Sequence, residues 1–547
     1  MKLKKPISER NAEKIFWAFL IISVIINSIW IFHDKTVPKG DGLVLLTRSI
    51  NIYKDLQEGN FNQAIYHLTK TNELKTDTPP APLVLFLFLL YYLFFGLMTK
   101  AELIVNSVFL AIILWSIYKI GYHLYNKKTG LLSVIIFNAF YILQYLSKTT
   151  FLEFHISAFI ALSFYFLLKT EKFTSKKYSV LLGISTGLAA LTKYTFFIYL
   201  IPSLIYVFIL LKKPTEKKLS NLFTSLIIFL IISGIWYIPM ANTYRDNLTS
   251  RLQHEKGEIY HLQVLSLKNL SIYPGWILNK ILGLLFSLLL IAAVIWKARK
   301  YKKISSEEIT LYSMFFIPLL MFMLVSKVKQ PAFIFPSFFP LSILMADFLI
   351  NIKIKNKIKL VLILLILLYS AYNAFLPFYK NPNFFYGVKN GKLQSLNEIS
   401  LLNQMSFQKD PNYEQIMLEI KKDPGTFVVW GEWTEVYFFT LEYYNLVYDV
   451  NAPFHYFYYR SGELMNQSSL TSEIIDIPHN YIANGKLEYV ILVLGNDPSN
   501  YTEILQELLD NKYEKINAYN YKGSSFLSKQ KMIFYKNDTP RTKVRGI

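Results

Sequence analysis

The chain has 547 residues, of which 53% are hydrophobic and 16% aromatic, and its net charge is +21. This composition excludes an ordinary soluble protein, because a soluble fold of this length cannot cover so many apolar side chains. The absence of cysteine excludes disulfides, thiolate metal sites and cysteine nucleophiles, and the basic residues lie in short loops between apolar runs, which indicates membrane orientation rather than nucleic-acid binding.

The first predicted element is a membrane span at residues 15–32. A secretory signal peptide has the same order of charge and hydrophobicity, but this run is long, no small-residue cleavage site follows it, and more spans come later. We therefore expect an uncleaved first helix with its N-terminus in the cytoplasm. The basic residues before it are Lys2, Lys4, Lys5, Arg10 and Lys14.

Eleven further apolar runs follow, and most approach the length of about 20 residues that a helix needs to cross a bilayer. The last of them ends near residue 377, which we take as the end of a transmembrane module at residues 1–377. The runs lie at residues 81–98, 101–122, 130–147, 151–168, 178–192, 194–211, 221–240, 276–296, 309–326, 331–350 and 360–377.

Basic loops between these runs set the predicted orientation, because such loops face the cytoplasm. An even number of runs separates each basic loop from the next. They agree with a cytoplasmic N-terminus only if residues 81–98 do not cross. We therefore expect 81–98 to be an interfacial or re-entrant segment, which leaves about eleven crossings. The loops are at residues 127–128, 169–177, 212–218, 297–303 and 353–359.

The composition changes after residue 378, where short strand patterns alternate with amphipathic helix patterns. This alternation predicts a small α/β domain at residues 378–547, which the orientation places outside the cytoplasm. The expected strands are at residues 425–432, 444–450, 487–495, 513–521 and 531–536, and the expected helices are at 412–422 and 501–513.

The first candidate site residue is Asp41, in the first outer loop at residues 33–80. A stretch with helical spacing of apolar residues follows it and is expected to lie on the membrane surface. A carboxylate at the start of a helix also serves as an N-cap, which is the structural alternative. Asp34 lies close by and is the rival for any functional role.

The second candidate is Glu153, at the start of an otherwise apolar run. An ionisable side chain at the end of a membrane helix is a functional hypothesis, and complementarity to the helix dipole is its structural alternative. His155 follows two residues later as a candidate for substrate binding. A single histidine at such a position is also typical of a hydrogen-bonding structural residue.

Three lysines are expected at the outer face, where the positive-inside rule disfavours them. Lys193 lies between two predicted spans, and Lys327 and Lys329 precede a third. A phosphate group at the membrane surface would explain them, because ammonium groups neutralise phosphate well. The alternative is that their side chains extend along apolar surface to reach water.

No Walker loop, dinucleotide fingerprint or zinc-ligand spacing is present, so the sequence predicts no cofactor and no metal. Several loose motifs in a fixed order nevertheless resemble the GT-C superfamily of membrane glycosyltransferases. The similarity is greatest to the branch of protein O-mannosyltransferases and the aminoarabinose transferase of lipid A (glycosyltransferase family 39-like). It covers about residues 10–350 and is carried by residues 40–61, 78–96, 118–140, 183–202 and 329–346.

This resemblance implies a polyprenyl-phosphate sugar as donor and transfer to an acceptor on the outer face of the membrane. It matches the family's catalytic carboxylate in the first outer loop to Asp41, a second acidic residue in the next outer loop to Glu153, and the family's lysine after about the sixth helix to Lys193. The acceptor it implies is a lipid, a glycan or a protein.

The chemistry of such a transfer needs a base for the acceptor's proton and cations for the departing phosphate. We expect Asp41 to be the general base of an inverting, single-step transfer, with Glu153 positioning the acceptor or tuning Asp41. Lys193, Lys327 and Lys329 would bind phosphate. The carboxylates could instead hold a divalent ion, as in the oligosaccharyltransferase relatives.

Two other classes of function are compatible with parts of the sequence. A polytopic transporter or lipid flippase would explain the spans, but it usually places polar groups near the bilayer midplane in paired halves. A scaffold or sensor would have the C-terminal domain as its working part.

Overall fold

The computed structural model describes two compact units. One unit comprises residues 1–33, 52–96 and 100–399, and the other comprises residues 34–51, 97–99 and 400–547. The described residues are 9–33, 41–69, 82–97, 101–210, 215–245, 267–299, 304–324, 331–375, 386–389, 392–395, 421, 427–432, 454–459, 489–494, 513–520 and 531–537.

The chain begins with a long helix, α1 (Glu9–His33), which contains the expected first span. Helices α2 (Asp41–Gln57) and α3 (Phe61–Thr69) follow. Between them Gly59 has φ +77°, a left-handed conformation that glycine adopts without strain.

Helix α4 (Pro82–Phe95) occupies the apolar run at 81–98. Its 14 residues span about 21 Å at 1.5 Å per residue, which is less than the roughly 30 Å of a bilayer core. The helix is therefore too short to cross alone, and the expectation that this run is interfacial or re-entrant stays a prediction.

The remaining helices of the first unit follow the expected runs closely. In chain order they are η1 (Ala101–Ile104), α5 (Val105–Leu124), α6 (Lys127–Asn138), α7 (Tyr141–Leu146), α8 (Leu152–Lys169), α9 (Lys176–Thr192), α10 (Phe196–Leu210), α11 (Glu216–Tyr237), α13 (Leu267–Trp276), the π-helical segment η3 (Ile277–Leu282), α14 (Gly283–Ala298), α15 (Ser306–Leu324), the 3₁₀ segment η5 (Pro331–Ser337), α16 (Phe339–Asn351) and α17 (Asn356–Phe375).

The expected continuous span at 130–147 is two helices instead, α6 and α7. Phe140 has an extended backbone with ψ 122°, and this conformation ends the helical hydrogen bonding. The Nε2 of Gln144 donates to the carbonyl oxygen of Asn138 at 2.9 Å, so the break satisfies a carbonyl that α6 leaves open. The run at 331–350 is likewise divided, because Pro336 cannot donate a helical hydrogen bond.

Five helices in the described ranges, α1, α5, α8, α11 and α15, are long and apolar enough to cross a membrane by length and composition. Shorter apolar helices lie at 82–95, 196–207, 285–298 and 339–351. The expected count of about eleven crossings stays a prediction.

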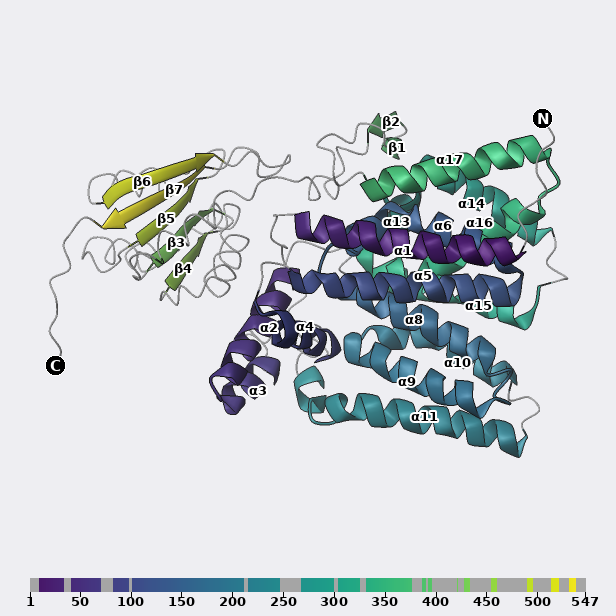
Figure 1. Ribbon diagram of the computed structural model, residues 1–547, viewed down its shortest axis with the longest axis horizontal. Coiled ribbons are helices and arrows are strands. Elements are labelled where there is room, and N and C mark those ends of the chain that lie inside the picture. The colour runs from purple at the N-terminus through teal and green to yellow at the C-terminus, as the bar shows by residue number, and fades with distance from the viewer. Residues whose placement is uncertain are drawn as a thin grey trace. The chain divides into compact units, whose positions relative to one another are not determined.

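Figure 1 shows α1, α5, α8, α9 and α11 running in similar directions along the bundle. Helices α9 and α11 are parallel and pack through two glycines. A Cβ added to Gly183 would lie 2.5 Å from the carbonyl oxygen of Ser225, and one added to Gly187 would lie 2.7 Å from Cβ of Ile232. This small-residue spacing is typical of close helix contacts in membranes, and it places the ends of α9 and α11 at the same end of the bundle.

The C-terminal unit contains a mixed five-stranded sheet in the order β4-β3-β5-β7-β6. Strand β3 is parallel to β4 and β5, while β7 is antiparallel to β5 and β6. The strands are β3 (Phe427–Glu432), β4 (Phe454–Tyr459), β5 (Tyr489–Leu494), β6 (Tyr513–Asn520) and β7 (Lys531–Asn537). A separate hairpin in the first unit pairs β1 (Tyr386–Lys389) with β2 (Lys392–Ser395).

Four of the five expected strands therefore coincide with β3, β5, β6 and β7. Strand β4 was not expected, and the strand expected at 444–450 lies outside the described residues. The helices expected at 412–422 and 501–513 also lie outside them, apart from helical Lys421. The α/β class of this domain and its boundary at residue 378 stay predictions.

Candidate active site

Two of the expected site residues form an ion pair. The Nζ of Lys193 donates to Oε1 of Glu153. Glu153 lies in the first turn of α8, and Lys193 is the residue directly after α9. Because α8 and α9 are antiparallel neighbours, the start of one helix meets the end of the other. The sequence identified both residues singly, and the fold brings them together.

The Glu153–Lys193 pair is shielded from solvent, with 4% of the Glu153 side chain and 17% of the Lys193 side chain exposed. The helix dipoles also stabilise both charges. Glu153 lies at the N-terminus of α8, which carries a partial positive charge, and Lys193 lies at the C-terminus of α9, which carries a partial negative charge. An ammonium has three N–H donors, so Lys193 can bind Glu153 and a further anion together.

The segment η5 also contacts Lys193. Its Nζ lies 5.4 Å from the centroid of the Phe333 ring, within the range of a cation–π interaction. The hydroxyl of Tyr199, on α10, donates to the carbonyl oxygen of the same Phe333. Helix α8 and the segment η5 thus contact Lys193 at the end of α9, and α10 binds η5 through Tyr199.

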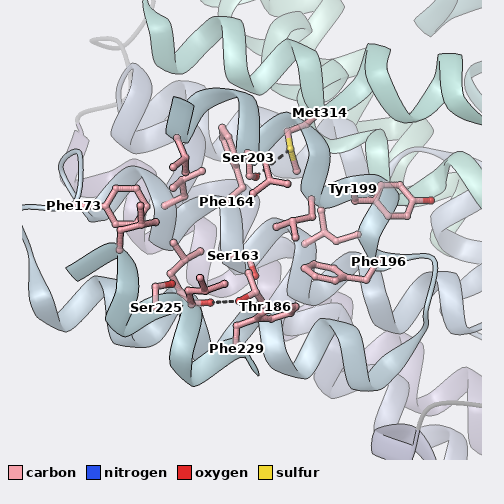
Figure 2. A pocket seen from close by; sticks show the side chains of 18 residues that line it. Ser163, Phe164, Phe173, Thr186, Phe196, Tyr199, Ser203, Ser225, Phe229 and Met314 are labelled. Atoms are coloured by element: carbon pink, nitrogen blue, oxygen red, sulfur yellow. Dashed lines mark hydrogen bonds between the residues drawn. The ribbon is translucent and has the colours of Figure 1, made fainter. Parts of the chain in front are cut away.

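An apolar cavity of about 120 Å³ extends from Tyr199 into the bundle. Figure 2 shows Tyr199 at one end of the cavity and Phe173 at the opposite end. Its walls come from α8, α9, α10, α11 and α15. Several hydroxyls in the walls have partners within the protein, such as Thr186 with the carbonyl of Leu182 at 2.8 Å, so the cavity presents mainly carbon.

His155 lies beside this site but not in the cavity lining. The residue is fully buried, with Nε2 2.8 Å from Oδ1 of Asn106 and Nδ1 3.2 Å from the carbonyl oxygen of Phe151. The Phe109 ring contacts it edge-on. Both ring nitrogens face protein groups, an arrangement that favours the structural alternative; substrate binding by His155 stays an untested prediction.

Three expected site residues cannot be placed in this geometry. Asp41 is the first residue of α2, and its side chain lies outside the described residues, so its catalytic role stays a prediction. Lys327 and Lys329 also lie outside them, in the sequence just before η5.

The sequence did not single out several residues that the structure places near this end of the bundle. Lys148 is 4% exposed; its Nζ donates to Gln144 and lies 5.5 Å from the Trp30 ring. Asn106 and Tyr199 are buried as well. The available signal was a polar side chain near the start of an apolar run for Asn106 and directly after such a run for Lys148.

A second buried ionic cluster lies where α14 ends and α15 begins. Lys297 donates to Glu308 and, at 3.2 Å, to Oδ2 of Asp347. The hydroxyl of Tyr125 also donates to Glu308. These contacts join α14, α15, α16 and the end of α5. In the described ranges no group of three or more His, Asp or Glu side chains could hold a metal ion.

Comparisons with known proteins place this arrangement in context. Residues 76–238 match the family described as dolichyl-phosphate-mannose-protein mannosyltransferase. The undecaprenyl phosphate-alpha-4-amino-4-deoxy-L-arabinose arabinosyl transferase of Wigglesworthia glossinidia brevipalpis is 31% identical over 257 residues, which cover 43% of this chain and 42% of that protein. A protein of Aquifex aeolicus is 27% identical over 241 residues, which cover 42% of this chain and 45% of that protein. The chain thus matches less than half the length of both curated relatives.

Solved structures resemble nearly the whole chain. Crystalline ArnT from Cupriavidus metallidurans bound to undecaprenyl phosphate has a TM-score of 0.59 at 12% identity, over 94% of this chain and 97% of that one. The archaeal oligosaccharyltransferase AglB from Archaeoglobus fulgidus, in complex with an inhibitory peptide and a dolichol-phosphate, has a TM-score of 0.51 at 12% identity, over 97% and 75%.

These similarities confirm the resemblance to GT-C membrane glycosyltransferases that the sequence indicated. The chain shares the fold of ArnT and has the apolar helices of a multi-pass membrane protein.

Proposed function

We propose that this chain is an integral-membrane glycosyltransferase that moves a sugar from a polyprenyl-phosphate donor to a lipid, glycan or protein acceptor. The transfer would take place at the end of the bundle that carries Glu153 and Lys193, which we expect to face the outside of the cell.

The observation that carries this proposal is that Phe333 links Lys193 to Tyr199, which lies at one end of the apolar cavity. A polyprenyl phosphate has an anionic head and a branched apolar tail, so its site needs a cation next to an apolar space. Tyr199 both lines that cavity and binds the carbonyl oxygen of Phe333, whose ring contacts Lys193. The relatives bound to undecaprenyl phosphate and dolichol-phosphate support this class of ligand.

The proposed mechanism is a single inverting displacement. Asp41 takes the proton of the acceptor hydroxyl or amine as its oxygen or nitrogen attacks the anomeric carbon, and the bond from that carbon to the lipid phosphate breaks. Lys193 stabilises the departing phosphate, together with Lys327 and Lys329. Glu153 holds the ammonium of Lys193 in place and positions the acceptor.

The distribution of charge also favours an enzyme over a transporter or flippase. In the described part of the bundle, the buried ion pairs Glu153–Lys193 and Lys297–Glu308 lie at helix ends. A transporter typically carries its polar site near the bilayer midplane, on broken helices. Chemistry on a lipid head group instead requires the charges at the surface.

The proposal can be tested by lipid binding. Purified protein in nanodiscs would be titrated with undecaprenyl phosphate and, separately, with undecaprenol, which lacks the phosphate. We expect Lys193→Met to weaken undecaprenyl phosphate binding about 10- to 100-fold, the value of one charge-assisted hydrogen bond of about 1.5–3 kcal/mol. Binding of undecaprenol should not change.

Lys169→Met provides the matched control, because Lys169 is the last residue of α8 and contacts the Tyr178 ring at the other end of that helix. This variant should bind both lipids as the wild type does. Equal affinity of the wild type for the two lipids, or equal weakening by both substitutions, would refute the proposed phosphate site.

A further inference from the structure

Glu153 is the second residue of α8, and the backbone that leads to it is a short irregular connection at residues 147–151, between α7 and α8. Such a connection fixes the first turn of the next helix only if its own backbone is held. Buried carbonyl groups outside regular structure also need donors. The question is therefore which side chains supply them.

Asn106, on α5, supplies donors to two of these carbonyls. Its Nδ2 lies 3.2 Å from the carbonyl oxygen of Ser147 and 2.8 Å from that of Thr149. The side chain is fully buried. The Asn106 amide, near the start of α5, thus binds the 147–151 connection at two residues, Ser147 and Thr149.

His155 fixes the orientation of that amide. Because the NH₂ group of Asn106 faces two carbonyls, its Oδ1 faces His155 and accepts from Nε2 at 2.8 Å. His155 itself lies one turn into α8, and its Nδ1 is 3.2 Å from the carbonyl oxygen of Phe151. The two side chains therefore contact the connection at its start, its middle and its last residue.

Helix α1 completes the arrangement at the start of the connection. The hydroxyl of Ser147 donates to Oδ1 of Asn27 at 2.9 Å, and Nδ2 of Asn27 donates to Ser107 at 3.1 Å. Asn27 is 3% and Ser147 1% exposed. The connection is thus held from α1 and α5 by the amides of Asn27 and Asn106, while His155 of α8 orients the Asn106 amide.

We propose that Asn106 and His155 are positioning residues that hold residues 147–151 so that Glu153 meets Lys193. Neither residue touches the transferred sugar or the phosphate in this inference. It rests on the proposed role of Lys193 in binding a lipid phosphate. It also gives His155 a different role from substrate binding, since both of its ring nitrogens face groups of the protein.

The wild-type chain has no cysteine, so a single introduced cysteine can be labelled selectively. A spin label on Thr149→Cys reports the mobility of the connection in nanodiscs, and titration with undecaprenyl phosphate and undecaprenol reports the phosphate site. Asn106→Leu keeps the branching and the number of heavy atoms of the side chain but has no polar group. We expect the spectrum of the spin label to change from that of an immobile label to that of a mobile one in this variant. We also expect undecaprenyl phosphate to bind at least tenfold more weakly, with undecaprenol binding unchanged.

The matched control is Ser28→Ala. Ser28 donates to Ser107 at 3.0 Å and belongs to the same group of hydrogen bonds, but it does not touch residues 147–151. Its label spectrum and its lipid affinities should equal those of the wild type. His155→Phe, which removes the donor that orients the Asn106 amide and should also make the label mobile, serves if Asn106→Leu does not fold. His155→Gln, which keeps an amide donor, should restore the label spectrum.

The inference is overturned if the label stays immobile in Asn106→Leu and His155→Phe, or if it becomes mobile without any loss of undecaprenyl phosphate affinity. In the second case these residues stabilise the fold but do not position the phosphate site. Failure of the proposed function is a separate result, since it appears in the wild type as equal binding of undecaprenyl phosphate and undecaprenol.

Discussion

Replacing Glu153 by glutamine should destabilise the bundle mainly through Lys193, which would lose its carboxylate partner in a shielded position. Removal of one partner from a buried ion pair costs about 3–5 kcal/mol. Since 17% of the Lys193 side chain is exposed, its ammonium can recover some hydration, and we expect a loss near the lower end of that range. Lys193→Met leaves the more deeply buried Glu153 unpaired and should cost somewhat more.

The double variant Glu153→Gln/Lys193→Met leaves no unpaired charge, so its loss should be smaller than the sum of the two single losses. We expect a coupling energy of about 2–3 kcal/mol, at the upper end of the range for contacting residues. Unfolding would be followed by tryptophan fluorescence as SDS is titrated into dodecyl maltoside micelles. The free energies of unfolding of the four proteins then give the coupling.

The pair Glu13–Lys127 provides the control cycle. Its nitrogen and oxygen are 2.6 Å apart, yet 39% of Glu13 and 20% of Lys127 are exposed. Exposed pairs contribute little to stability, because water and salt screen them, so this cycle should give a clearly smaller coupling. Additive losses at Glu153 and Lys193, or equal couplings in both cycles, would refute the reasoning from burial.

The remaining predictions concern packing, the second ionic cluster and catalysis. Gly183→Ala should cost about 1–3 kcal/mol in the same unfolding assay, because its Cβ meets the backbone oxygen of Ser225, whereas Gly234→Ala meets only the flexible end of a side chain and should cost less. Lys297→Met should cost about 3–5 kcal/mol by leaving two buried carboxylates, without changing undecaprenyl phosphate affinity; a changed affinity would contradict its separation from the site. Asp41→Asn should make cells accumulate one polyprenyl-phosphate sugar at equal protein level, measured by mass spectrometry of extracted lipids, and unchanged lipids would argue against Asp41 as the base.

Hydrophobic runs located most helices of the bundle from the sequence alone. The run at 151–168 is α8 (Leu152–Lys169), and the run at 178–192 is α9 (Lys176–Thr192). Apolar length determines these elements directly, because a bilayer requires it. The break after Asn138 had no such signal: no proline or glycine marks it, and the side chain of Gln144 that satisfies the open carbonyl is recognisable only in three dimensions.

The candidate site was predictable one residue at a time. Charged residues at the ends of apolar runs pointed to Glu153 and Lys193, but their pairing depends on the antiparallel packing of two helices, which composition does not encode. Asn106 was missed because an asparagine at the start of an apolar run has the appearance of a simple helix start. Its two carbonyl partners lie 41 and 43 residues further along the chain.

The glycine contacts between α9 and α11 have a consequence for the shape of the apolar cavity. Backbone meets backbone at Gly183, and such a contact has no side chain that could yield, so this wall is rigid. The opposite wall is made of adaptable side chains, including Met314 and Leu200, and methionine is the most easily reshaped of apolar residues. The cavity therefore has one fixed side and one compliant side. If it takes the proposed lipid tail, the compliant side would adapt to the methyl branches while α9, the helix that ends directly before Lys193, stays in place.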